Sequence, residues 1–190
     1  MMTADQVLTL FRQSGALLEG HFRLSSGLHS GGYLQCALVL QFPAYATTLG
    51  AALAERARDC RSTMVLSPAL GGIVIGQEVA RGLGVRALFA ERQEGTLTLR
   101  RGFSISSDDR VLVVEDVVTT GGSTRETMEV ARAAGALVVG AASIIDRSTE
   151  PTKLDVPLLS LVKYPLPTYE AAACPLCAQG VPVVKPGSRT

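Results

Sequence analysis

Residues 111–124 read VLVVEDVVTTGGST, and this segment constrains the fold more than any other part of the chain. Its apolar residues before the acidic pair predict a buried strand of a parallel sheet. The Thr/Gly/Ser run predicts a tight turn, followed by a helix that begins near Arg125. Strand, turn and helix in this order are typical of an α/β fold, in which helices flank a mostly parallel sheet.

The same segment brings two kinds of ligand-binding group together. Glu115 and Asp116 come at the carboxyl end of the expected strand, where open α/β sheets bind ligands. The turn offers backbone N–H groups at a helix N-terminus, which favours a phosphate. Because carboxylates repel a bare anion, the pair suits a ligand that also carries hydroxyls or a metal ion, such as a sugar phosphate with a vicinal diol. An ordinary strand–turn–helix connection is the alternative, but it leaves the paired carboxylates unexplained.

The composition agrees with a single domain. The chain has 190 residues, of which 47% are hydrophobic, and this is enough to bury a full core. No apolar run has the length of a membrane span, and the N-terminus lacks the basic region of a signal peptide. The net charge of +1 leaves no electrostatic footprint for nucleic acid. We therefore expect a cytoplasmic protein with reduced thiols that binds neither nucleic acid nor membranes.

Strand and helix patterns alternate along much of the chain, and they weaken after residue 150, where several prolines break them. The expected elements are a helix over 3–14, a strand, loop and second strand over 20–35, a helix with Pro43 in its first turn, a strand over 64–67, a helix over 73–81 ending at Gly82, a strand over 85–90, a polar excursion or hairpin over 91–109, and a strand over 137–145.

The segment 111–124 resembles the phosphoribosyl pyrophosphate (PRPP) signature of the type I phosphoribosyltransferases. The resemblance implies one domain over 1–190, with a small hood (roughly 1–40 plus part of the C-terminal tail) and a PRPP-binding core (roughly 41–150). It implies that the acidic pair holds the ribose diol, that residues 119–124 hold the 5′-phosphate, and that Mg²⁺ bridges PRPP oxygens. A second glycine turn, SPALGG, would border the pyrophosphate. The PRPP-binding residues implied are Glu115, Asp116, Val117, Val118, Thr119, Thr120, Gly121, Gly122, Ser123, Thr124, Gly71 and Gly72.

Two further segments resemble the orotate phosphoribosyltransferases, in particular short bacterial forms with a cysteine-containing tail. Residues 20–35 match a Ser-Gly-x-x-Ser-x-x-Tyr segment that covers the pyrimidine, and residues 143–147 match a strand ending in Asp-Arg. In that family the arginine pairs with the orotate carboxylate, a task that suits the planar guanidinium. The orotate-binding residues implied are Thr119, Arg147, Ser26 and Tyr33.

The resemblance implies a homodimeric enzyme of pyrimidine (UMP) biosynthesis that makes orotidine 5′-monophosphate and pyrophosphate from orotate and PRPP. A transferase for another base, such as a purine, is one alternative. A regulator that senses PRPP or a nucleotide without catalysis is another. Turnover with orotate separates the enzyme from the sensor, and a panel of competing bases separates orotate from purines.

The chain departs from better-known members at basic positions. Ser25 and Gly71 stand where those members carry lysine, and the catalytic-loop run 91–101 contains neither lysine nor histidine. Arg92, Arg100 and Arg101 are its basic residues, and together with Asp116 they are the predicted catalytic residues. Arginine can neutralise pyrophosphate but cannot act as a base. The reaction depends more on neutralising the leaving group than on proton transfer, so catalysis remains expected.

Cys174 and Cys177 form a Cys-x-x-Cys pair that resembles a zinc knuckle, which supplies two of the four ligands of a closed site. Cys36 and Cys60 lack such spacing. We expect two reduced thiols here, with a zinc site shared between subunits as the alternative. The two histidines, at positions 21 and 29, are interpreted as solvated or packed side chains of the hood, and a catalytic role for either is the less favoured alternative.

Overall fold

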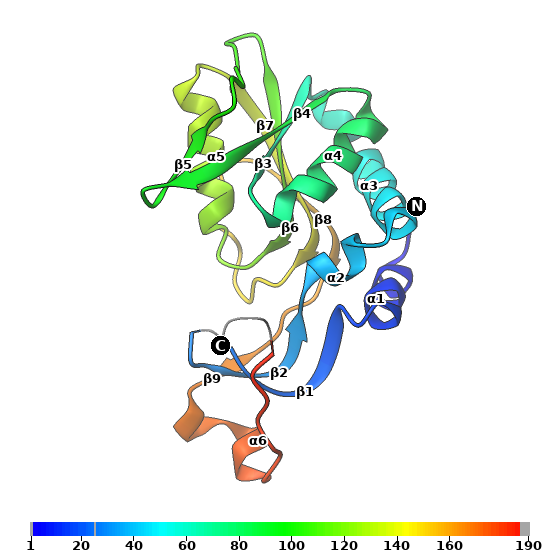
Figure 1. The fold of residues 1–190 in the computed structure, drawn as a ribbon, viewed down its shortest axis with the longest axis vertical. Helices are drawn as coiled ribbons and strands as arrows, with labels where there is room; N and C mark the ends of the chain where they lie inside the picture. Colours follow the sequence, from blue (N-terminus) through cyan, green and yellow to red (C-terminus); the bar gives the residue numbers. More distant parts are fainter. Residues whose placement is uncertain (1, 25, 187–190) are drawn as a thin grey trace.

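The computed structural model describes residues 2–24 and 26–186, so Ser25 lies outside the described part of the chain. Figure 1 shows a larger α/β body and a smaller sheet below it, which is the hood. The chain enters the hood near its beginning, passes through the body, and returns to the hood at its end.

The body is built on a six-stranded sheet with the order β5-β4-β3-β6-β7-β8. All neighbouring pairs are parallel except β4 and β5, which form an antiparallel hairpin. This confirms the predicted mostly parallel sheet. The central strands are the most apolar, and residues 111–114 are fully buried. The strands are β3 (Met64–Pro68), β4 (Arg86–Gln93), β5 (Thr96–Leu99), β6 (Arg110–Val118), β7 (Leu137–Asp146) and β8 (Leu158–Lys163).

Helices cover both faces of this sheet. One apolar cluster joins α1, α3 and α4 to one face, and a second joins α5 to the other. Helices α3 and α4 pack closely because Gly50 lacks a side chain, since a Cβ atom there would lie 2.3 Å from the Cβ of Glu78. The helices are α1 (Ala4–Gln13), α2 (Cys36–Leu40), α3 (Pro43–Ala57), η1 (Arg58–Cys60), α4 (Gly71–Leu83), α5 (Gly122–Ala133), η2 (Ala171–Ala173) and α6 (Pro175–Ala178).

The hood is a three-stranded antiparallel sheet of β1 (Leu17–Arg23), β2 (His29–Leu34) and β9 (Thr168–Tyr169). The two N-terminal strands therefore pair with a strand from the C-terminal tail (Figure 1). After α6 the tail runs back along β1, where Val184 accepts a hydrogen bond from the N–H of Arg23 and donates one to the carbonyl of His21. Both ends of the chain thus build the hood.

Local signals placed most elements, with some corrections at their ends. Thr3 caps α1 through a capping box, and Pro43 starts α3, as predicted. Helix α4 begins at Gly71 rather than Ile73 and runs past Gly82 to Leu83. Helix α5 begins at Gly122, three residues before Arg125, because Gly121 adopts φ +74° and starts the helix early.

The sequence patterns missed β8 and β9, which lie in the proline-rich region after residue 150. Strand β9 has only two residues, and prolines at 157, 165 and 167 flank the two strands rather than interrupt them. The predicted strand over 85–90 also continues to Gln93, because its last residues pair with β5 in the hairpin. Across residues 2–24 and 26–186, no helix combines the length and apolar character needed to cross a bilayer.

Candidate active site

Glu115 is held at the carboxyl end of β6 by the first turn of α5. Its Oε1 accepts a hydrogen bond of 2.6 Å from the Ser123 hydroxyl, and its Oε2 accepts one of 2.7 Å from the Thr124 hydroxyl. Glu115 and Thr124 are buried. The two hydroxyls were predicted to face a phosphate, but in the structure they fix the orientation of the carboxylate. Their backbone N–H groups stay at the helix N-terminus.

Asp116 brings the two predicted glycine turns together. Its Oδ1 accepts a hydrogen bond of 2.8 Å from the N–H of Val117. A Cβ atom on Gly71 would lie 2.8 and 2.9 Å from the two carboxylate oxygens. A side chain at position 71 would therefore require the Asp116 carboxylate to move, and the glycine lets the turn before α4 approach Asp116 closely.

Both carboxyl groups are destabilised in their charged form. Burial raises the pKa of Glu115, and the hydrogen bonds from Ser123 and Thr124 offset part of this effect. Burial also raises the pKa of Asp116, against the lowering effect of the Val117 N–H. Within the described residues, neither carboxylate forms an ion pair with an arginine or lysine. Two adjacent acids, one buried and one partly buried, with raised pKa values and no ion pair are typical of a functional site.

The turn between β6 and α5 exposes Thr119 and Thr120 and leads into the N-terminus of α5. The first N–H groups of a helix have no partner within the helix, and the helix dipole adds to their attraction for an anion. On one side of the turn lies a cavity of about 570 Å³ whose lining includes Arg125 and Lys153. Sequence reasoning missed these two cations, because nothing in the motif pointed to them.

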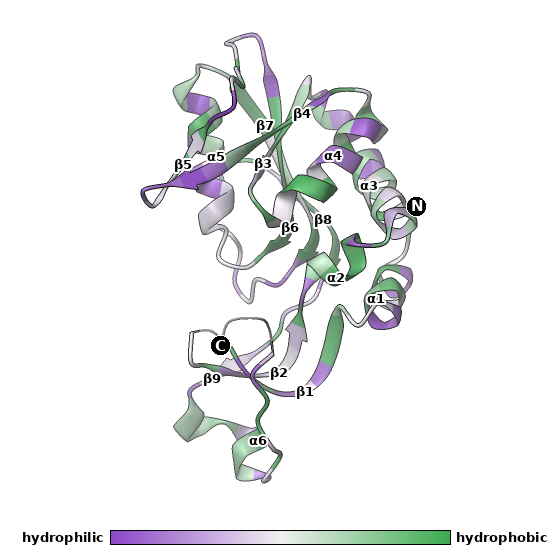
Figure 2. Cartoon of the chain, in the orientation of Figure 1, coloured by the Kyte–Doolittle hydropathy of each residue, from purple (hydrophilic) through white to green (hydrophobic). Residues whose placement is uncertain are grey.

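A small cavity of about 110 Å³ lies where the predicted site residues meet. Six of them line it: Gly71, Gly72, Arg92, Glu115, Asp116 and Ser123. Arg92 comes from the β4–β5 hairpin, and its guanidinium donates to the Glu126 carboxylate at 2.8 Å and to the carbonyl of Gly95. Figure 2 shows hydrophilic residues around the turn of this hairpin. The hairpin thus brings a cation close to Glu115 and Asp116 in β6, which together are called the acidic edge of the body sheet.

Arg100 and Arg101 do not line that cavity. Arg101 forms a two-bonded ion pair with Glu91, at 2.7 and 2.8 Å, and its guanidinium lies 5.8 Å from the centre of the Phe89 ring. Arg100 is exposed. Their catalytic role therefore stays a prediction.

Arg147 directly follows β7 and lies near the hood residues Tyr33 and Cys36. Its backbone N–H donates to the carbonyl of Val118, at the end of β6. Its Nε is buried without a hydrogen-bond partner among the described residues, although burial disfavours the charged guanidinium and lowers its pKa. A buried donor left unpaired in this way is suited to an anionic ligand.

Cys36 was considered in the sequence only as a stray thiol, yet it lies against Asp116. Burial raises its pKa well above the ordinary value, and the charge of Asp116 raises it further. It therefore adds a neutral thiol between the acidic pair and Arg147. Ser26 lies farther along the hood hairpin, where its exposed hydroxyl accepts a hydrogen bond from the N–H of Leu28.

Cys174 and Cys177 do not lie apart from other ligating groups. They meet His21 and His29 in the hood, outside the cavity at the acidic pair. The two histidines are packed side chains of the hood, as interpreted. Their contact with the two cysteines was not predicted, because it arises only when the tail folds back onto the β1–β2 hairpin. The other two cysteines, Cys36 and Cys60, lie outside this cluster.

Comparisons with known proteins identify the family of this chain. A family model described as "Phosphoribosyl transferase domain" matches residues 39–165. Curated proteins named orotate phosphoribosyltransferase from Chlorobaculum parvum and Pelotomaculum thermopropionicum are 52% and 53% identical, over 100% and 99% of this chain and 98% and 99% of their own lengths. The crystal structure of orotate phosphoribosyltransferase from Aeropyrum pernix superposes with a TM-score of 0.69 at 27% identity, covering 83% of this chain and 93% of that one. The chain belongs to the orotate phosphoribosyltransferase family.

Proposed function

We propose that the protein transfers the phosphoribosyl group from PRPP to orotate, giving orotidine 5′-monophosphate and pyrophosphate in pyrimidine biosynthesis. The observation that carries this proposal is the acidic pair Glu115–Asp116, in which the partly buried Asp116 lies against Gly71 and the buried Glu115 is bonded to the first turn of α5. A sugar phosphate with a free diol supplies hydroxyl donors for the carboxylates and an anion for the helix end.

Each part of the substrate then meets a group of matching chemistry. The carboxylates of Glu115 and Asp116 accept hydrogen bonds from the ribose hydroxyls, while the turn over 119–122 binds the 5′-phosphate. Arg147, with its unpaired buried Nε, pairs with the carboxylate of orotate. The anomeric carbon loses its bond to a pyrophosphate oxygen and gains one to the deprotonated ring nitrogen of orotate. Arg92 neutralises part of the charge that develops on the leaving pyrophosphate.

Magnesium is part of the proposal. Carboxylate oxygens are the ligands that Mg²⁺ prefers, and among the described residues no arginine or lysine forms an ion pair with Glu115 or Asp116. Mg²⁺ bound to PRPP would supply further neutralisation of the pyrophosphate. The carboxylates would hold the ribose, and Gly71 and Gly72 would leave room for the pyrophosphate beside them.

We also propose that the protein is a cytoplasmic homodimer. Four large apolar side chains lie exposed on α2, at the start of α3 and around the start of α4, and packing between subunits would cover them. They are Leu38, Phe42, Leu70 and Val74. Light scattering coupled to gel filtration should give the mass of a dimer, and the mass of a monomer would contradict this part of the proposal.

The test of function is an assay of the purified full chain with PRPP, Mg²⁺ and orotate, followed by the loss of orotate absorbance. Steady turnover is expected, and its absence would leave the non-catalytic sensor as the better reading. Uracil lacks the carboxylate that Arg147 would bind, so it should be a poor substrate. A purine that is consumed faster than orotate would reassign the base.

A matched variant tests the role of Arg147. Arg147→Ala should raise the KM for orotate about tenfold or more, because a hydrogen bond to a charged group is worth about 1.5–3 kcal/mol. The KM for PRPP should change much less. Equal increases in both KM values would indicate a general loss of structure, and Arg147 would then no longer be assigned to the base.

A further inference from the structure

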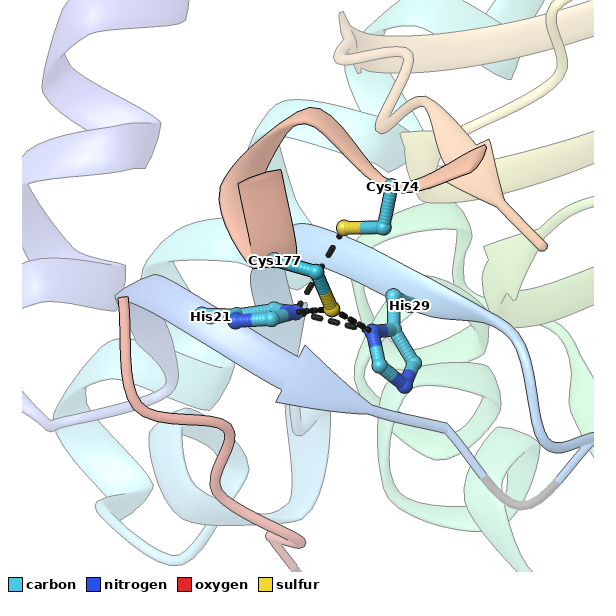
Figure 3. Close-up of side chains that lie close together, drawn as sticks. All are labelled: His21, His29, Cys174 and Cys177. Carbon is cyan, nitrogen blue, oxygen red and sulfur yellow. Dashed lines mark hydrogen bonds between the residues drawn. The ribbon is translucent and has the colours of Figure 1, made fainter. Parts of the chain in front are cut away.

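Four side chains that prefer soft metal ions converge in the hood (Figure 3). The atoms that they offer all lie within 4.8 Å of one another. Cys174 Sγ lies 3.5 Å from His21 Nε2, and Cys177 Sγ lies 3.3 Å from His29 Nδ1 and 3.8 Å from His21 Nε2. A tetrahedral zinc ion, about 2.3 Å from sulfur and about 2.0–2.1 Å from nitrogen, places a sulfur and a nitrogen about 3.6 Å apart. The three sulfur–nitrogen distances lie close to this value.

We propose that His21, His29, Cys174 and Cys177 bind one Zn²⁺ within a single chain, as a closed structural site that fixes the C-terminal tail to the hood. This goes beyond the transferase activity and does not depend on it.

The backbone builds this cluster from both ends of the chain. His21 lies on β1 and His29 on β2, and these strands pair with Arg23 opposite His29. Cys174 immediately precedes α6, and Cys177 lies in its single turn. Gly180 then adopts φ +70°, so the tail turns back toward β1. This cysteine pair, its intervening turn and the glycine form a knuckle whose two sulfurs face the two imidazoles (Figure 3).

The second ring nitrogen of His21 has the partner that a metal ligand needs. Its Nδ1 lies 2.7 Å from the carbonyl of Val181, which can only accept a hydrogen bond. The proton is therefore placed on Nδ1, and the lone pair of Nε2 faces His29 and the cysteines. Metal-bound histidines usually donate their other N–H to a carbonyl or carboxylate in this way. The tail that supplies the thiols also orients the imidazole.

Burial and charge also favour an ion at this place. Cys174, His21 and His29 are only 3%, 3% and 6% exposed. Zn²⁺ would replace the protons of the two thiols, so two thiolates and two neutral imidazoles would give a site with no net charge. A neutral site is easier to bury than an isolated ion. Two sulfurs and two nitrogens at tetrahedral spacing favour zinc over the hard cations, and four protein ligands leave no open position for catalysis.

Metal analysis of the purified full chain tests the proposal. The parent is loaded with ZnCl₂ in the presence of a reductant, passed through gel filtration in metal-free buffer, and measured by inductively coupled plasma mass spectrometry. About one zinc per chain is expected for a four-ligand site. The double variant Cys174→Ser/Cys177→Ser should retain less than about a tenth of this amount, while the matched control Cys60→Ser should retain it all, since Cys60 lies outside the cluster. A parent without zinc, or a double variant with full zinc, would overturn the proposal.

A second measurement does not depend on how the variants fold. Replacing zinc with Co²⁺ in the parent should give the visible bands of a tetrahedral ion and the charge-transfer bands of cobalt–thiolate bonds. Thiol labelling adds a further readout, because Cys174 and Cys177 should react with a thiol reagent only after zinc is chelated. A disulfide between these two cysteines in the zinc-treated parent, or an octahedral cobalt spectrum, would refute the site.

Discussion

The polar groups of two regions differ in their surroundings. The acidic edge of the body sheet consists of Glu115 and Asp116, and the His/Cys cluster of the hood consists of His21, His29, Cys174 and Cys177. At the acidic edge, burial raises the pKa of Glu115 and Asp116, and no protein cation pairs with them among the described residues. In the hood, the four groups face one another at the spacing of a bound ion. Burial disfavours the charged carboxylates at the edge, where a ligand is proposed to bind, whereas the proposed zinc ion would stabilise the cluster. Buried polarity alone therefore does not identify a catalytic site.

The largest effect on stability is expected from removing zinc from the hood. An ion present at about a thousand times its Kd stabilises the folded state by about 4 kcal/mol. In a chain of this size each kcal/mol moves Tm by about 2–4 °C, so a chelator should lower Tm by roughly 10 °C. Calorimetry with and without 1,10-phenanthroline measures the shift. The Cys174→Ser/Cys177→Ser variant should start from the lower Tm and not respond, and a response equal to that of the parent would contradict the comparison.

Substitution of Asp116 at the acidic edge should lower enzymatic activity rather than stability. Asp116→Asn removes a charged acceptor for the ribose diol, a loss of about 1.5–3 kcal/mol, so kcat/KM for PRPP should fall on the order of tenfold to a hundredfold. Steady-state kinetics measures the change, with circular dichroism to check the fold. Glu129→Gln is the matched control, because this exposed glutamate on α5 pairs with Arg132 alone among residues 2–24 and 26–186. Unchanged kinetics in Asp116→Asn would remove the pair from the active site.

Arg92 should have a smaller effect. It lines the cavity at the acidic edge but is half exposed, and an exposed charge pair is worth at most about 1 kcal/mol, or about fivefold in rate. Arg92→Ala should lose about this much turnover, while Arg92→Lys keeps most of it, since pyrophosphate needs a cation rather than a base. Glu126→Gln is the control, because it frees Arg92 from its ion pair and should not lower turnover. If Arg92→Ala matches the parent, Arg100 and Arg101 become the next candidates.

The smallest expected effect is a change with pH in the difference in unfolding free energy between the parent and Asp116→Asn. Because burial raises the pKa of Asp116, the folded state binds more protons than the unfolded state between the unfolded pKa and the raised folded pKa. The parent therefore loses stability as pH rises through this window, and the loss is complete above the folded pKa. Asp116→Asn lacks this loss, so its stability relative to the parent should increase across the window and then stay constant. Urea denaturation at several pH values measures it, and a constant or falling difference would show that the charged form is not destabilised.

The sequence predicted the acidic edge because its groups are neighbours in the chain. Strand, carboxylates, turn and helix occupy one run of fourteen residues, and local rules place each part. The finer geometry could not be read in this way. Whether Ser123 and Thr124 face a phosphate or Glu115 depends on the first residue of α5, and the contact of Gly71 with Asp116 depends on how two strands align.

The hood was harder to predict, because its contacts join residues that lie far apart in the sequence. Strand β9 has only two residues, and the prolines beside β8 and β9 weaken the pattern, so the return of the tail to β2 had no local signal. Without that return, Cys174 and Cys177 supply only two of the four ligands that a closed zinc site needs. A contact that depends on the whole topology leaves no periodicity in the sequence, even when each residue type is suggestive.

The construction of the hood from both ends of the chain also sets an order of events during synthesis. His29 leaves the ribosome early, but its partner Cys177 lies 148 positions later. At about 5–20 residues per second, roughly 7–30 s pass before the two can meet. During that time the body sheet can assemble strand by strand, while the β1–β2 hairpin waits without its third strand. The hood is therefore the last part to fold on a nascent chain, and translation that stops before residue 174 leaves it incomplete.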